Sequence, residues 1–288
     1  MFAASEYQLV DFGLGRKLER FGPHLLDRPA PAAEGLRQAD PQAWRRATAR
    51  YDRLAAERGV WRPVTTDGPP LADRWTVRHA GISLELKPTN FGHLGVFPEQ
   101  AANWDWIARQ VAGAGRRLSV LNLFGYTGAS TLAAAAAGAD VVHVDAARNT
   151  VDWARRNADL SGLDQAPIRW IHEDAATFVR RELKRRHAYD AVILDPPSYG
   201  HGAKGQTWKL ADQLADLLDD CARLTADRRC FILVTCHTPG FEAEKLRTLL
   251  AQAISPGASS SDDVECGPMT LVAADGRALA SGAMARVS

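Results

Sequence analysis

From residue 118 onward, short apolar runs alternate with longer amphipathic segments, and this alternation restricts the fold more than any other feature of the chain. The apolar runs are LSVLNLF, DVVHVD, PIRWIH, DAVILD and CFILVT. The segments between them repeat apolar residues every three to four positions, as amphipathic helices do. Strands that alternate with helices in this way form a parallel sheet with helices on both faces. The sequence therefore predicts an α/β domain over residues 91–288.

The final segment, GPMTLVAADGRALASGAMARV, predicts two more strands joined by a turn at Asp275 and Gly276. An α/β sheet that ends in a hairpin is typical of class I methyltransferases more than of dehydrogenases. The expected fold is therefore Rossmann-like, with a seven-stranded sheet in the order 3-2-1-4-5-7-6.

Residues 1–90 predict a mostly β appendage with a possible role in substrate recognition. YQLVDFG and RKLERFG have the character of short strands, and RWTVRHAGISLELKP predicts a hairpin around His79, Ala80 and Gly81. PQAWRRATARYDRLAAER has helical spacing instead, and another helix is expected to begin near Pro98.

Composition excludes several classes of protein. The net charge of +1 gives no global basic field, and the basic run RRELKRRH at 180–187 is typical of a solvated helix face. The four cysteines form no CxxC pair, so we expect no metal site, no disulfide framework and a reducing cytoplasm. The N-terminus does not resemble a signal peptide, and no apolar run is long enough to span a membrane.

Three predicted strands end in carboxylates around a glycine-containing turn. Gly125 and Gly128 follow the first strand, where a ligand can approach the backbone closely. Asp145 ends the second strand, where an acidic residue can bind both ribose hydroxyls of a nucleoside, and Asp174 follows the third, where it can accept from an adenine amine. Either aspartate can instead be a helix N-cap. The pattern predicts an adenosine pocket without a pyrophosphate-binding motif.

The runs LNLFGYTGAS, VVHVDAARNTVDWARRNADLSGL, EDAATFV and YDAVILDPPSY, in this order, resemble the S-adenosylmethionine-dependent methyltransferases related to the 23S rRNA cytosine-C5 enzymes. FGHLGVFPEQAANWDWI is similar to that family's Gly-aromatic-Gln segment, so the resemblance covers about residues 84–288. That family's RNA-binding PUA module has no recognisable counterpart in residues 1–90. The resemblance implies S-adenosylmethionine as cofactor, RNA as partner, and cofactor-binding roles for Asn122, Gly125, Tyr126, Thr127, Asp145, Asp174, Asp195, Phe97 and Gln100.

The fourth strand leads into DPPSYGHG, which predicts the catalytic platform. Asp195 projects from the strand end, and Pro196 and Pro197 direct the chain along a stiff path that leaves their carbonyls free to accept from a substrate. Tyr199 can stack on a planar base. The following glycines, Gly200, Gly202 and Gly205, predict a loop that closes over it.

Cys236 follows the fifth strand, which the predicted strand order places beside the fourth. It is therefore either the thiolate that adds to C6 of a cytosine or a small buried core residue. His201 and His237 are candidate proton acceptors or bystanders, and Trp208 and Lys209 are candidates for contact with nucleic acid or for packing.

Three functions are compatible with these residues. The first is an RNA cytosine-C5 methyltransferase that uses Cys236. The second is an N-methyltransferase of a base or small amine that needs Asp195, Pro196, Pro197 and Tyr199 but not the thiol. The third is a cofactor-binding RNA or assembly factor without turnover.

Overall fold

The computed structural model describes residues 1–55, 58–65, 69–201, 205, 207–255 and 263–288. Two compact units divide it: unit 1 comprises Met1–Ala101 and Thr270–Ser281, and unit 2 comprises Ala102–Met269 and Gly282–Ser288. The boundaries of these compact units differ from those of the predicted domains, 1–90 and 91–288. The functional division into those two domains stays a prediction. None of the described helices is long and apolar enough to cross a bilayer.

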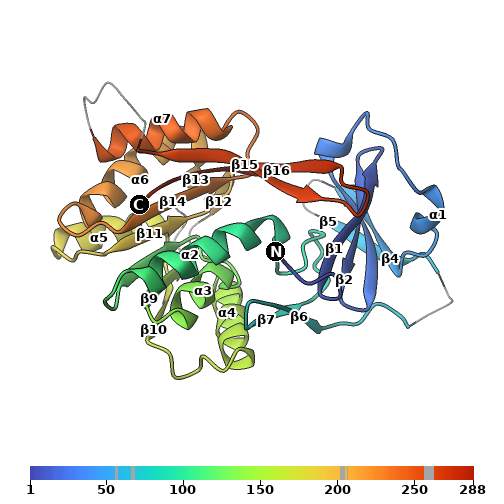
Figure 1. Ribbon diagram of the computed structural model, residues 1–288, viewed down its shortest axis with the longest axis horizontal. Helices are drawn as coiled ribbons and strands as arrows, with labels where there is room; N and C mark the ends of the chain where they lie inside the picture. Colours follow the sequence, from blue (N-terminus) through green and yellow to red (C-terminus); the bar gives the residue numbers. More distant parts are fainter. Residues whose placement is uncertain (56–57, 66–68, 202–204, 206, 256–262) are drawn as a thin grey trace. The chain divides into compact units, whose positions relative to one another are not determined.

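Unit 2 is built on the predicted seven-stranded sheet (Figure 1). Its strands are β8 (Ser119–Leu123), β9 (Asp140–Asp145), β10 (Ile168–His172), β11 (Ala191–Leu194), β14 (Phe231–Cys236), β15 (Glu265–Val272) and β16 (Ala278–Val287). Their order, β10-β9-β8-β11-β14-β16-β15, is 3-2-1-4-5-7-6 when the strands of this sheet are numbered along the chain. The first five strands are parallel, and β16 pairs antiparallel with β14. The Rossmann-like fold class is confirmed.

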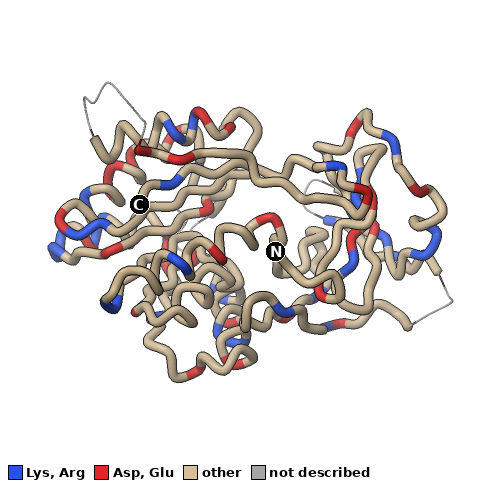
Figure 2. Tube along the Cα trace, in the orientation of Figure 1, with Lys and Arg blue, Asp and Glu red and all other residues tan. Residues whose placement is uncertain are grey.

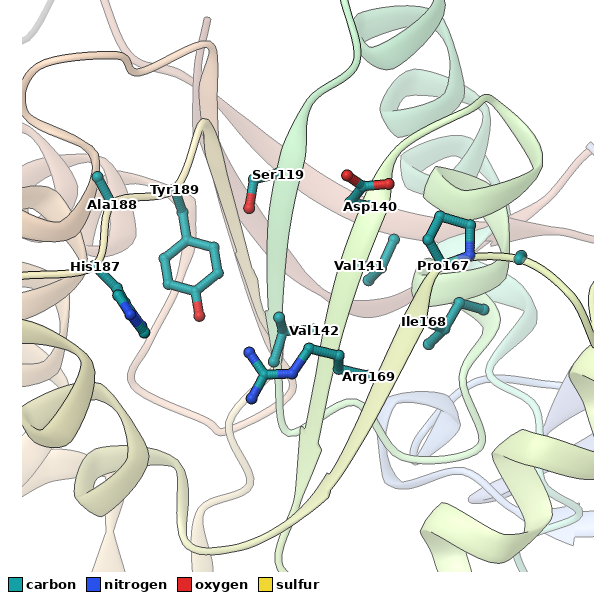
Figure 3. A pocket seen from close by; sticks show the side chains of 11 residues that line it. Ser119, Asp140, Val141, Val142, Pro167, Ile168, Arg169, His187, Ala188 and Tyr189 are labelled. Carbon is teal, nitrogen blue, oxygen red and sulfur yellow. The ribbon is translucent and has the colours of Figure 1, made fainter. Parts of the chain in front are cut away.

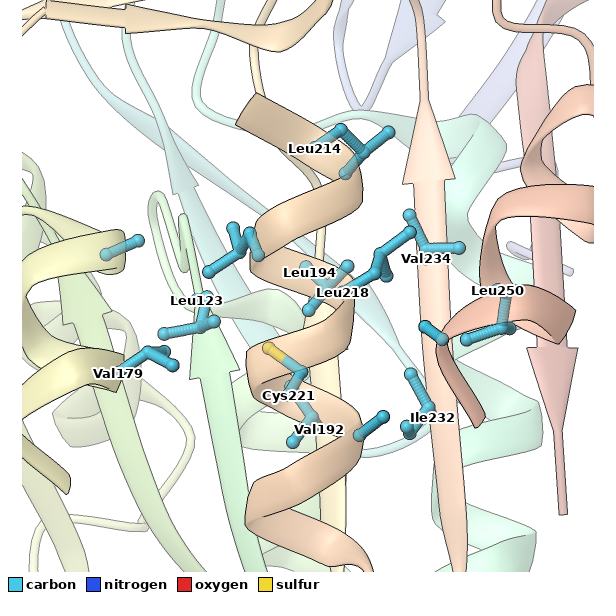
Figure 4. Packing of buried hydrophobic residues seen from close by; sticks show 14 of the residues in the cluster. Leu123, Val179, Val192, Leu194, Leu214, Leu218, Cys221, Ile232, Val234 and Leu250 are labelled. Carbon is cyan, nitrogen blue, oxygen red and sulfur yellow. The ribbon is translucent and has the colours of Figure 1, made fainter. Parts of the chain in front are cut away.

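Helices cover both faces of this sheet. They are α2 (Ala101–Gly113), α3 (Ala129–Ala136), α4 (Arg148–Leu160), α5 (Ala175–Lys184), α6 (Leu210–Thr225) and α7 (Ala243–Ile254). On one face, Leu214, Leu218 and Cys221 of α6 pack on strands β8, β11 and β14 (Figure 4). On the other face, α2 and α3 pack on Val120, Ile193 and related side chains. Because the strands are buried from both sides, their sequences are continuously apolar, which is the pattern that predicted them.

Unit 1 contains a five-stranded sheet of β1 (Tyr7–Gly13), β2 (Arg16–Phe21), β3 (His24–Pro29), β4 (Ala49–Ala55) and β5 (Arg58–Pro63), in that order. The predicted hairpin is present as β6 (Trp75–His79) and β7 (Ile82–Leu86), with Ala80 and Gly81 at positive φ. The helix predicted near Pro98 is present as the 3-10 turn η2 (Pro98–Gln100) followed by α2. Short turns η1 (Pro31–Ala33) and α1 (Pro41–Trp44) complete the unit.

The prediction of one long helix from Pro41 was wrong. Asp40 caps α1, but the helix ends at Trp44 and the chain continues as strand β4. The buried residues here are spaced two apart, as in a strand: they are Ala47, Ala49 and Tyr51. Two of them, Ala47 and Tyr51, also belong to the predicted helical face, so the sequence fits both spacings. The Tyr51 hydroxyl donates to the carbonyl of Asn90 at 2.7 Å, so tertiary contacts select the strand.

Asp11 is the central polar residue of unit 1. Its buried carboxylate accepts hydrogen bonds from Trp44 Nε1 at 2.8 Å and from a guanidinium nitrogen of Arg277 at 2.5 Å. It also accepts from the backbone amides of Phe12, Ala39 and Asp40. Burial alone would raise the pKa of Asp11, but these hydrogen bonds outweigh it and hold the pKa below its usual value. Asp11 therefore holds the tip of the β15–β16 hairpin in unit 1.

Asp11→Ala should lower the free energy of unfolding by about 3–5 kcal/mol, because it leaves the partners of a buried carboxylate unpaired. Urea denaturation followed by tryptophan fluorescence measures the loss. Asp275→Ala is the control, because Asp275 also pairs with Arg277 but lies at the exposed hairpin turn, and its loss should be much smaller. Equal losses in the two variants would contradict the central role of Asp11.

A second carboxylate, Asp190, connects the amino ends of the central strands in unit 2. It is fully buried, and it accepts from Arg116 at 2.6 Å, from Arg228 at 2.6 and 2.7 Å, and from the amide of Ser119 at 2.7 Å. Burial opposes ionisation, but the hydrogen bonds from the two arginines dominate and lower the pKa of Asp190 to about 2.

This low pKa predicts a specific dependence of stability on pH. A carboxyl group whose pKa is lower in the folded state contributes stability above its unfolded pKa and loses it as the pH falls through the folded pKa. The stability difference between wild type and Asp190→Asn should therefore be constant above a pH of about 4 and narrow toward pH 2. Denaturant titrations at a series of pH values measure it, and a difference that stays constant at low pH would refute the assignment.

Candidate active site

The carboxyl ends of the parallel strands meet at one edge of the unit 2 sheet, and most of the predicted site residues of this unit follow those ends. Residues 124–128 follow β8, Asp145 is the last residue of β9, and Asp195 directly follows β11. Register aligns Leu123 with Val144 and Leu194 with Val234. The structure therefore brings the turn, Asp145, Asp195 and the end of β14 to the same edge, where ligands bind in open α/β sheets.

The turn after β8 has an unusual backbone. Phe124 and Tyr126 have positive φ angles of 53° and 49°, and Gly128 has a φ of 92°. A non-glycine residue in this region costs about 1–2 kcal/mol, and such residues concentrate at functional sites. The conformation directs the Tyr126 amide to Asp145 Oδ2, at 2.9 Å. The turn is thereby fixed to the end of the neighbouring strand.

Asp145 is positioned by two backbone amides. Oδ2 accepts from Tyr126, and Oδ1 accepts from Ala147 at 2.9 Å. Burial raises the pKa of Asp145, while both hydrogen bonds act in the opposite direction. Each carboxylate oxygen has further acceptor capacity. This half-buried, fixed acceptor pair fits the two hydroxyls of a ribose.

Gly125 is required by a histidine that the sequence analysis did not identify. A Cβ at Gly125 would lie 2.5 Å from Nδ1 of His143, whose ring is fully buried in β9. Burial lowers the pKa of His143 to about 3, so the ring is neutral at physiological pH. The role expected for Gly125 was close approach of a ligand, but its visible role is to make room for this imidazole. A histidine inside the apolar run DVVHVD was the available signal.

The other predicted residues near the turn form a buried polar network. Asn122 Nδ2 donates to the Thr131 hydroxyl at 2.8 Å, and that hydroxyl lies 2.9 Å from His143 Nδ1. The carbonyl of buried Thr127 accepts from Asn157 at 2.8 Å. The visible role of Asn122 and Thr127 is therefore to hold the turn, and direct contact with a cofactor stays a prediction for both.

For three more predicted cofactor residues, Asp174, Phe97 and Gln100, the structure gives less support for a role in cofactor binding. Asp174 is the N-cap of α5 and accepts from the Thr177 amide at 2.8 Å through Oδ1. This is the capping role that was left open, and Oδ2 is the oxygen that a ligand amine would use. Phe97 and Gln100 lie in unit 1, at η2, and their role in cofactor binding stays a prediction.

Asp195 lies in a cluster of polar side chains. Its Oδ1 accepts from the hydroxyl of Thr235 at 2.7 Å and lies 3.6 Å from Nε2 of His237. The Asp195 side chain is 30% exposed, so it is accessible while being held from the side of β14. Thr235 was not predicted, although its position one residue before Cys236 placed it at the same strand end.

The chain after Asp195 includes a pair of short strands, and most of the predicted glycine loop between them lies outside the described residues. Strand β12 (Tyr199–His201) pairs with β13 (Thr207–Lys209), and α6 begins only at Leu210. Trp208 is a packing residue: its ring is buried 5.0 Å from that of Phe124. Its Nε1 donates to the Pro197 carbonyl at 2.7 Å, so the prediction that both proline carbonyls are free was wrong for Pro197. Gly202 and the side chain of His201 lie outside the described residues.

The residues from Pro196 to Tyr199 differ in exposure and in their contacts. Tyr199 is 53% exposed, as expected of a side chain that stacks on a substrate. Ser198 Oγ lies 2.7 Å from Thr238 Oγ1, so the segments that follow β11 and β14 are connected. Pro196 is buried beside Asp195, whereas Pro197 is exposed.

Cys236 has the environment of a core residue. Its side chain is 1% exposed and belongs to the same cluster as Ile232 and Val234, whereas Thr235 points to the other face, toward Asp195. Burial raises the pKa of the Cys236 thiol, and the hydrogen bond from the Thr238 amide only partly offsets this. These features favour the second sequence hypothesis, a small buried residue.

A separate cavity of about 480 Å³ lies at the opposite edge of the sheet (Figure 3). It is bounded by residues at the amino ends of the strands, among them Ser119, Asp140, Ile168, Arg169 and Tyr189. None of the predicted site residues lines it, so it is distinct from the candidate active site. No group of three His, Cys, Asp or Glu side chains suited to a metal ion occurs among the described residues.

The strand order, the constrained turn and the carboxylates at one edge define a Rossmann-like methyltransferase fold. The sequence profile of S-adenosylmethionine-dependent methyltransferases matches residues 42–234. A crystal structure of an S-adenosylmethionine-dependent methyltransferase from Agrobacterium tumefaciens is 35% identical to this chain. The two superpose with a TM-score of 0.90 over 98% of this chain and 90% of that one.

Two curated relatives carry more specific names. Ribosomal RNA large subunit methyltransferase I of Aeromonas hydrophila is 31% identical over 50% of this chain and 32% of its own length. Ribosomal RNA large subunit methyltransferase K/L of Hahella chejuensis is 31% identical over 52% of this chain and 20% of its own length. The chain thus spans a third or less of these relatives. It belongs to the S-adenosylmethionine-dependent methyltransferase family.

Gly125→Ala should weaken binding of S-adenosylmethionine about tenfold or more, a loss of at least ~1.4 kcal/mol, because the new methyl group displaces the turn from His143. Isothermal titration calorimetry measures the affinity. Gly113→Ala is the control, because a Cβ there meets no atom within 4 Å, and it should bind normally. The double variant Gly125→Ala/His143→Ala should recover part of the loss, and normal binding by Gly125→Ala would disprove this role for the contact.

Proposed function

We propose that this protein transfers a methyl group from S-adenosylmethionine to a base of large-subunit ribosomal RNA, and that it acts in the cytoplasm. The names of the curated relatives support the RNA substrate. The observation that carries the proposal is that the segment after β11 holds both an exposed aromatic side chain, Tyr199, and an accessible carboxylate, Asp195. An aromatic face stacks on a base, and such stacking contributes ~1–3 kcal/mol per base.

The donor side of this edge fits S-adenosylmethionine. Asp145 would accept from the ribose hydroxyls, and Asp174 Oδ2 would accept from the adenine amine. The amides at the start of α3 and the turn at 124–128 would approach the rest of the molecule. When bound, the cofactor supplies a methyl group on a positively charged sulfur.

The acceptor side favours an exocyclic amine over the C5 carbon of cytosine. Asp195 and the Pro196 carbonyl would accept the two amine hydrogens and orient the nitrogen lone pair. With the cofactor bound, the nitrogen would take the methyl group from the sulfur as the carbon–sulfur bond breaks, and Asp195 would accept the proton that the nitrogen loses. His237, 3.6 Å from that carboxylate, is placed to accept the proton in turn.

Transfer to C5 would need a thiolate in contact with C6 of the base. The Cys236 thiol is 1% exposed, and burial raises its pKa. The cytosine-C5 reaction is therefore the second candidate, supported by the sequence resemblance around DPPSY and TC.

Two variants separate these reactions. Asp195→Ala should lower kcat about 10²–10⁴-fold, the usual contribution of a group that transfers a proton in the transition state. Cys236→Ala should change kcat by less than about threefold, because no covalent step is lost. Single-turnover methyl transfer from labelled S-adenosylmethionine to unmodified large-subunit RNA measures both, and mass spectrometry of the digested RNA identifies the modified base.

Full loss of turnover in Cys236→Ala, with normal cofactor binding and a 5-methylcytosine product, would establish the C5 reaction instead. Absence of any methylated nucleoside in the RNA would overturn the RNA substrate.

A further inference from the structure

We infer that the strand pair β4–β5 in unit 1 is a binding surface for the phosphate backbone of RNA. This inference rests on the proposed RNA substrate and assigns a place on the chain where that RNA is held. It concerns unit 1 alone and uses none of the residues of the candidate active site.

The charge of the chain is concentrated in this segment. Residues 45–62 contain six arginines and two acidic residues, a net charge of +4, whereas the whole chain has a net charge of +1. The remaining residues therefore sum to −3. A local field of this kind attracts a polyanion even when the whole protein is nearly neutral.

All six arginines are exposed, and they lie before and along β4 and β5. Figure 2 marks every described Lys and Arg of the trace in blue. Arg45 and Arg46 immediately precede β4. Arg50 and Arg62 lie directly opposite one another in the register of β4 and β5. Arg53 and Arg58 lie at the far end, where Arg53 pairs with Gly59 and Arg58 with Ala55. We call these six residues the arginine stripe.

Within the described residues, only two of the six arginines of the stripe have carboxylate partners. Arg50 and Arg62 share the carboxylate of Asp52, and Arg50 also lies 3.7 Å from Asp27. Among the described residues, no carboxylate lies within ion-pair distance of Arg45, Arg46, Arg53 or Arg58. These four residues are exposed, and the planar guanidinium matches the geometry of phosphate.

A second basic segment, the run at 180–187, is neutralised only in part, since no carboxylate in the described part of the chain forms an ion pair with Arg180, Lys184 or Arg186. In and beside the run at 180–187, Arg181 pairs with Glu173 at 2.5 Å, and Arg185 pairs with Glu182 at 3.2 Å. Arg116 and Arg228 both bind the buried Asp190. The charges of these four arginines are used within the fold, as expected of a structural surface.

The position of the stripe suits a long ligand. β5 is the edge strand of the five-stranded sheet, and no other described strand pairs with its outer side, although the Gly59 amide donates to the Asn90 carbonyl at 2.8 Å. Trp61 is half-buried on β5, with its Nε1 donating to the Thr89 carbonyl at 3.0 Å, which keeps the strand in place. Contacts with phosphate fix the register of a nucleic acid and are independent of its sequence.

The test compares two variants of the full chain that lose the same charge. The stripe variant carries Arg45→Gln, Arg46→Gln, Arg53→Gln and Arg58→Gln. The control variant carries Arg117→Gln, Arg181→Gln, Arg223→Gln and Arg247→Gln, whose side chains are exposed or half-exposed and paired with Asp140, Glu173, Asp220 and Glu244. Fluorescence anisotropy with a short fluorescein-labelled single-stranded RNA measures Kd across a series of salt concentrations.

The stripe variant should bind this RNA at least about tenfold more weakly than wild type. The slope of log K against log salt should fall by about 2–3, because each neutralised phosphate of a single strand contributes ~0.7. The control variant should keep the wild-type Kd within about twofold. Both variants should bind S-adenosylmethionine as wild type does, which excludes misfolding.

Two results would overturn the inference in different ways. Failure of the wild-type protein to bind RNA would remove the proposed substrate and the stripe's function together. The second result has wild-type protein that binds and methylates RNA, together with a stripe variant that has the wild-type Kd or with stripe and control variants that lose the same affinity. In either case the proposed function stands and the stripe is not the binding surface. The stripe would then serve only to protect the sheet edge from pairing with other strands.

Discussion

The proposed cofactor-binding side of the candidate active site depends on the close approach between the ring of His143 and the backbone of Gly125. The imidazole fills the space under the turn, and the turn can pass over it only because residue 125 has no side chain. That path places the flanking residues at positive φ and directs the Tyr126 amide to Asp145. One close approach therefore sets the position of the carboxylate that is proposed to bind the ribose. The ring is neutral because burial lowers its pKa, so it fills this space without introducing a charge.

The proposed acceptor side, around Asp195, depends on strand register. β11 and β14 are parallel and aligned, so Asp195 and Thr235 leave the sheet at the same level and form a hydrogen bond. The same register explains why Cys236 does not join them. Successive residues of a strand point to opposite faces, and the face that Cys236 shares with Val234 is the one covered by α6 and α7. Cys236 is therefore next to Thr235 along the strand, but its side chain lies in the hydrophobic core.

The sequence predicted the sheet, its order and its edge because these follow from hydrophobic periodicity and from rules of connection. It did not predict β4, because Trp44, Ala47 and Tyr51 satisfy a helical spacing and only the neighbouring strands select between the two periods. His143 and Thr131 were missed because their roles arise from contacts between residues on different elements. The use of the Pro197 carbonyl by Trp208 likewise depends on a hairpin that the glycines of the loop did not indicate.

The hairpin β15–β16 has a consequence for the evolution and engineering of this chain. Its strands belong to unit 2 at their sheet ends and to unit 1 at their tip, where Arg277 reaches Asp11. The chain therefore passes between the units at three places, and no single cut separates them. A fragment that begins at residue 102 would keep the strands of the unit 2 sheet, but Arg277 would lose Asp11 and retain only its exposed partner Asp275. The N-terminal unit is thus not a removable module, and gain or loss of such a unit in evolution would require the hairpin to change with it.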